Sequence, residues 1–78
     1  MMHFDVRRRR RSMYVELSEG QARLLTKQLE VRIDELEKEA ARTDRHDLQH
    51  ALALDIDRLK EILARVDSGL RQAAAARA

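Results

Sequence analysis

The residues with the most obvious chemistry lie near the beginning of the chain, in one uninterrupted basic run. The run consists of Arg7, Arg8, Arg9, Arg10 and Arg11. Arginine binds phosphate well because its planar guanidinium donates paired hydrogen bonds, and each neutralised phosphate releases counterions. A basic N-terminal arm is a recurrent way to hold nucleic acid. No aromatic residue is interleaved with these arginines for stacking on bases, however.

Three interpretations of the arginine run remain open. It is a functional arm, an inert solvated tail, or a leader that is not part of the native protein. The third arises because Ser12 alone separates the run from Met13, and the arginine codons AGG and AGA resemble a ribosome-binding site. The five arginines and Asp5 give residues 1–12 a net charge of +4. Because the whole chain has a net charge of +2, residues 13–78 have a net charge of −2. The basic character therefore belongs to the arm.

Two histidines, His46 and His50, lie one helical turn apart, the spacing at which two imidazoles can share a metal ion. A structural zinc site needs four ligands, and a catalytic one needs at least three from the protein. Only acids on neighbouring turns are available here, so a solvated pair is the favoured interpretation. We expect neither a metal nor a cofactor.

Asp44 and Asp47 form a D-x-x-D pattern in the segment "TDRHD" between two apolar-patterned stretches. Helix capping explains both aspartates. The segment also resembles the acidic tip of the coiled-coil fingers in DksA and the Gre transcription factors, which enter the secondary channel of RNA polymerase. Those families have longer fingers and a further globular domain, which this sequence lacks.

Catalytic patterns are absent from the sequence. It contains no Cys nucleophile and no Gly-rich phosphate loop, and none of its serines has a neighbouring His. Its carboxylates are spread along charged segments that also contain Lys and Arg. We therefore expect the protein not to be an enzyme.

Hydrophobic periodicity predicts a first helix over residues 19–42. Ser18 can cap its free N–H groups, with Gln21 at capping-box spacing, and Glu19 suits the helix dipole. Apolar residues then recur every three or four positions and form one stripe. The stripe consists of Ala22, Leu25, Leu29, Ile33, Leu36 and Ala40.

A second helix is predicted over residues 45–68, with Thr43 or Asp44 as its N-cap and Asp47 in its first turn. Its stripe consists of Leu48, Leu52, Ile56, Leu59, Leu63, Val66 and Leu70. Ser68 and Gly69 are expected to end this helix, because Gly readily takes a left-handed conformation. The Ala-rich tail of residues 69–78 favours helix but has little to pack against.

The predicted fold class is all-α. Two coiled-coil-like helices of equal length, joined by two or three residues, must fold back as an antiparallel αα-hairpin. One hairpin cannot cover both stripes, and the chain has no Cys for disulfides, so we expect a homodimer that forms a four-helix bundle. The expected core and dimer residues are Leu25, Leu29, Ile33, Leu36, Leu52, Ile56, Leu59, Leu63 and Val66.

The segment "MYVEL" at residues 13–17 alternates in polarity and predicts a short strand. The order strand, helix, helix resembles that of ribbon-helix-helix repressors, which read the major groove with a paired strand. Glu16 would repel phosphate there, and both helices are too long for that compact fold. We therefore favour a helical hairpin over the ribbon-helix-helix fold.

The "YVEL" opening, the "RTD" turn and two Leu-patterned helices together resemble a recurring kind of short, uncharacterised bacterial helical-hairpin protein. The resemblance spans residues 13–66 and implies a prokaryotic, cytoplasmic hairpin with no known activity. The expected organisation is a disordered basic arm (1–12), a hairpin (13–68) and a tail (69–78).

The predicted function is a non-enzymatic protein–protein interaction or dimerisation module with an unknown protein partner. The alternatives are a nucleic-acid-binding dimer that uses the arginine run and a transcription-associated hairpin with an acidic tip.

Overall fold

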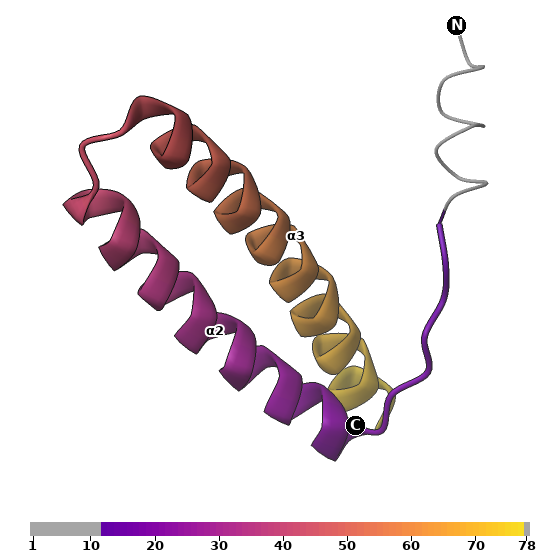
Figure 1. Cartoon of the computed structure of the whole chain (residues 1–78). Coiled ribbons are helices and arrows are strands. Elements are labelled where there is room, and N and C mark those ends of the chain that lie inside the picture. Colours follow the sequence, from indigo (N-terminus) through magenta and orange to yellow (C-terminus); the bar gives the residue numbers. More distant parts are fainter. Residues whose placement is uncertain (1–11, 78) are drawn as a thin grey trace, which may run out of the picture.

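The computed structural model describes residues 12–77, and these form two helices, α2 (Glu19–Arg42) and α3 (His46–Arg77). The helices lie side by side and run antiparallel, joined by residues 43–45 (Figure 1). The predicted all-α hairpin is therefore confirmed for a single chain, and the bounds of the first helix agree with the expected 19–42. The arginine run at residues 7–11 lies outside the described residues.

The start of α2 is held by the predicted capping box. The Ser18 Oγ accepts a hydrogen bond from the Gln21 backbone N–H at 3.1 Å, and the Gln21 Oε1 accepts one from the Ser18 N–H at 2.9 Å. Two of the N–H groups that would otherwise lack partners are thereby satisfied. Glu19 adds a negative charge in the first turn, where it suits the helix dipole.

The beginning of α3 differs from the prediction. Thr43 has an extended conformation and is the C-cap of α2, so it is not the N-cap of α3, and neither is Asp44. The Arg45 carbonyl accepts the hydrogen bond from the Gln49 N–H at 2.9 Å, which places the cap at Arg45. Asp47 does lie in the first turn, as expected, and its Oδ1 accepts a hydrogen bond from the N–H of the following residue at 2.9 Å.

The core lies between the two helices and follows the predicted stripes. Its centre is a cluster of four buried side chains with partly buried neighbours around it. Among the expected core residues, Leu29, Ile33, Leu36, Leu52 and Ile56 are buried, whereas Leu25, Leu59, Leu63 and Val66 are half-buried. Ala22 is also buried. The core is thin, since even its most buried side chain, Leu36, is 4% exposed.

The expected end of the second helix at Ser68 and Gly69 is wrong, because α3 continues to Arg77. Gly69 has a negative φ and takes an ordinary helical place. The tail also packs better than expected: Leu70 and Ala73 are half-buried. Because alanine has the highest helix propensity, the Ala-rich turns offset the cost of about 1 kcal/mol that a glycine imposes inside a helix.

Gly69 is accordingly a position where a substitution should stabilise the protein. A Cβ added there would meet nothing within 4 Å, and the residue is exposed. Gly69→Ala should therefore raise the free energy of unfolding by about 0.5–1 kcal/mol. Urea denaturation followed by circular dichroism would measure this gain, and an unchanged midpoint would contradict the position of Gly69 inside α3.

The segment before α2 contains none of the predicted strand in the described part of the chain, which begins at residue 12. Its apolar side chains are open to solvent: Met13 is 80% exposed, Tyr14 100% and Val15 68%. The hairpin therefore leaves this segment without a packing partner from its own core.

Candidate interaction surface

The two sides of the hairpin differ in chemistry. Successive residues on a helix are turned by about 100°, so Arg32 and Glu37 lie on opposite flanks of the buried stripe of α2. On the flank of Glu37, its carboxylate forms an ion pair with Lys60 of α3 at 3.2 Å. On the flank of Arg32, side chains of α3 continue the apolar stripe beyond the area that α2 covers. We call this second side the apolar face, defined by Leu48, Ala51, Leu59, Ile62 and Val66.

The apolar face is incompletely buried. Leu48 is 37% exposed and Ile62 44% exposed, while Leu59 and Val66 are half-buried. A contiguous exposed apolar patch, unlike single exposed apolar side chains, commonly marks a site where another protein surface binds. The stripe of α3 is therefore wider than a single partner helix can cover.

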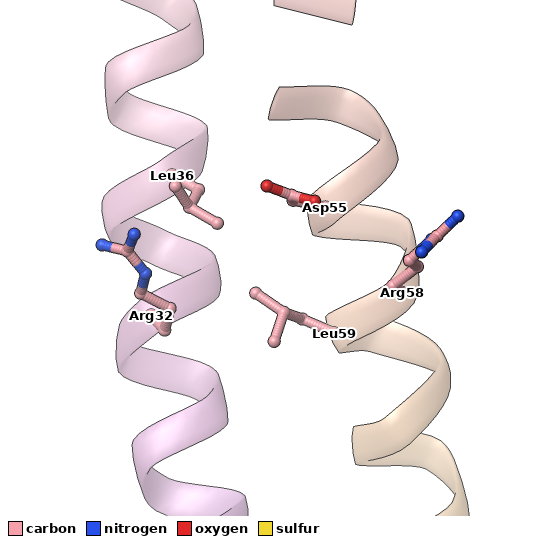
Figure 2. A pocket seen from close by; sticks show the side chains of 5 residues that line it. All are labelled: Arg32, Leu36, Asp55, Arg58 and Leu59. Carbon is pink, nitrogen blue, oxygen red and sulfur yellow. The ribbon is translucent and has the colours of Figure 1, made fainter. Parts of the chain in front are cut away.

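A shallow hollow of about 260 Å³ lies on the same side, between the two helices. It is lined by Arg32 and Leu36 from α2 and by Asp55, Arg58 and Leu59 from α3. Figure 2 shows Leu36, Asp55 and Leu59 directed toward the gap between the helices, whereas the two guanidinium groups turn away from it. The lining thus combines two leucine side chains with one carboxylate and two guanidinium groups.

The candidate metal ligands are not brought together with further ligands. His46 and His50 are both exposed in the first turns of α3. Within residues 12–77, no three His, Cys, Asp or Glu side chains gather in a way that would hold a metal ion. Both imidazoles are open to solvent.

At the tip of the hairpin, Asp44 and Asp47 are both exposed. Asp47 Oδ2 accepts a hydrogen bond from the Arg45 guanidinium at 3.1 Å, in an ion pair that is largely solvated. Such exposed pairs contribute about 0–1 kcal/mol. Asp47 lies in the first turn of α3, whereas Asp44 lies in the connection before it.

One structurally important residue was missed by sequence reasoning. The Gln49 Nε2 donates hydrogen bonds to the carbonyls of Thr43 at 2.9 Å and Ala40 at 3.5 Å. It thereby satisfies carbonyls at the end of α2 from the first turn of α3. Nothing in the sequence marks this glutamine, because its role depends on how the connection at residues 43–45 folds.

Asp55 and Arg58 were also missed, since charged residues on a helix are ordinarily solvated. Their position beside the apolar face is determined by the packing of the two helices.

Within residues 12–77, neither helix combines the length and the apolar character that crossing a membrane would require. Comparison of the chain with protein-family models, with curated proteins and with solved structures finds no significant match.

Proposed function

We propose that this protein is a non-enzymatic interaction module whose hairpin pairs with a second copy to form a four-helix bundle. The observation that carries the proposal is the incomplete burial of the α3 stripe. Leu48 and Ile62 remain exposed, and Leu59 and Val66 are only half-buried. A second hairpin laid against these residues would cover them, as facing helices do in bundles.

The small size of the core supports the same proposal. Only six apolar side chains are buried among the described residues, and none of them is fully enclosed. A core in a chain below about 70–80 residues rarely supplies more than about 3–5 kcal/mol. The chain has no cysteine, so disulfides cannot stabilise the folded state. Association with a second copy would stabilise the folded state by mass action.

Two outer sides of the hairpin would remain available to a partner protein. Leu24, Val31 and Leu54 lie off the core stripes and are 61%, 48% and 47% exposed. In a four-helix bundle built on the apolar face, these side chains would remain on the outside. Leu24 and Val31 lie on the side of α2 that faces away from α3, and Leu54 lies on the side of α3 that faces away from α2. We assign contact with another protein to these two outer sides of the hairpin.

Sedimentation equilibrium of the full chain tests the proposal. The expected result is a mass of twice the chain's 9.1 kDa. The midpoint of thermal unfolding should also rise with protein concentration, because only the folded state associates. A mass of one chain at all concentrations, with a constant midpoint, would exclude the dimer.

A further inference from the structure

We propose that the second copy docks on the apolar face so that the two α3 helices cross antiparallel, and that Asp55 of each copy pairs with Arg58 of the other. This inference rests on the proposed dimer and specifies which face forms it. It predicts an interface that is self-complementary in charge as well as in shape. The opposite side of the hairpin would stay in solvent.

One row of side chains along α3 has the spacing of a contact between helices. Leu48, Ala51, Asp55, Arg58 and Ile62 follow one another at steps of three, four, three and four residues. This is the spacing of residues at the contact between two packed helices. All five residues are exposed in the single hairpin. They therefore form a row with the periodicity of a helix–helix contact, and residues 12–77 provide no partner helix for it.

This row is also suited to two-fold symmetry. In a two-fold symmetric interface, if one residue contacts a second across the axis, the second contacts the first in the same way. An axis between residues 56 and 57 of antiparallel α3 helices places Asp55 opposite Arg58, and Ala51 opposite Ile62. The first pairing joins opposite charges, and the second places a small side chain opposite a large one. Both pairings occur twice in the dimer.

The charges of Asp55 and Arg58 are not paired with other charges among the described residues. In the described residues, Asp55 and Arg58 form no ion pair, although they lie three residues apart on one helix. Other charged residues on one helix do form ion pairs at similar spacings. Arg32 pairs with Glu35, three residues away, at 3.3 Å, and Lys38 pairs with Asp34, four residues away, at 3.0 Å. Figure 2 shows the Asp55 carboxylate and the Arg58 guanidinium pointing in different directions. Both groups are thus available to a second copy.

The charges on the opposite side of the hairpin disfavour self-association there. The acids Glu30, Glu37 and Asp57 lie on that side, and Lys60 already pairs with Glu37. A second copy placed against it would bring carboxylates toward carboxylates, and like charges facing each other across an interface oppose binding. The electrostatic contrast between the two sides favours the apolar face.

Charge reversal tests the proposal by sedimentation and size-exclusion chromatography. Asp55→Arg alone places arginines against arginines, and Arg58→Asp alone places aspartates against aspartates. Each variant should therefore dimerise at least about tenfold more weakly than the wild type. Mixing the two variants should restore dimers, since every contact across the axis then joins opposite charges. The double variant Asp55→Arg/Arg58→Asp should also recover the wild-type affinity.

Asp57→Arg is the matched control, because it makes the same charge change on the opposite side of α3. It should leave the dimer unchanged, and circular dichroism should show that every variant stays helical. If both single variants dimerise as tightly as the wild type, this inference is overturned while the proposed function stays intact. The inference is also overturned, with the proposed function intact, if neither the mixture of the two variants nor the double variant regains the wild-type dimer affinity. A monomeric wild type would overturn both.

Discussion

Leu36→Ala is expected to lower the free energy of unfolding by about 2–5 kcal/mol, which is enough to leave the chain largely unfolded at room temperature. Leu36 is the most buried of the core residues, at 4% exposed, and packs in one cluster with Ile33, Leu52 and Ile56. Truncation removes its transfer free energy and leaves a cavity between two helices. Because a core of this size supplies only about 3–5 kcal/mol in total, little stability would remain.

Urea denaturation followed by far-UV circular dichroism would measure the loss. The matched control is Leu24→Ala, the same substitution on the same helix at a side chain that is 61% exposed. We expect the control to change stability by no more than about 0.5 kcal/mol. Similar midpoints for the two variants would contradict the assignment of Leu36 to the core.

The position of α2 and the pairing of the helices were predictable because both depend on local patterns. Apolar residues at steps of three and four define the stripe, and Ser18 with Gln21 defines the start of α2. A short connection then forces the helices to fold back. Such features need no knowledge of tertiary contacts, so the sequence alone is sufficient to derive them.

The end of α3 was not predictable in the same way. A glycine signals a helix end only if the residues after it gain nothing from continuing the helix. Leu70 and Ala73 are half-buried, so they do gain packing, and the helix passes through Gly69. The cost of one glycine is about 1 kcal/mol and is smaller than the combined gain of two further turns.

The candidate site depends even more on tertiary structure. The periodicity identified the core stripe, including Leu59 and Val66, but not which side of it remains open to solvent. That side is determined by how α3 is rotated against α2, and the role proposed for Asp55 and Arg58 follows only from this rotation. An isolated aspartate or arginine in a helical sequence carries no such information.

Gln49→Ala is expected to lower the free energy of unfolding by about 1–3 kcal/mol, although alanine is the better helix former. The last carbonyls of a helix lack partners within it. At the end of α2, the Gln49 side chain donates hydrogen bonds to the carbonyls of Thr43 and Ala40. Gln49 is half-buried, so water can replace these bonds only in part.

Two further variants separate this bridging role from the loss of side-chain volume. Gln28→Ala makes the same change at an exposed position of α2 and should alter stability by no more than about 0.5 kcal/mol. Gln49→Glu keeps the shape, but its carboxylate only accepts hydrogen bonds and would face two carbonyl oxygens. It should therefore destabilise the hairpin, even though a negative charge near the start of α3 suits the helix dipole. A Gln49→Glu variant as stable as the wild type would show that the glutamine does not hold the two helix ends together.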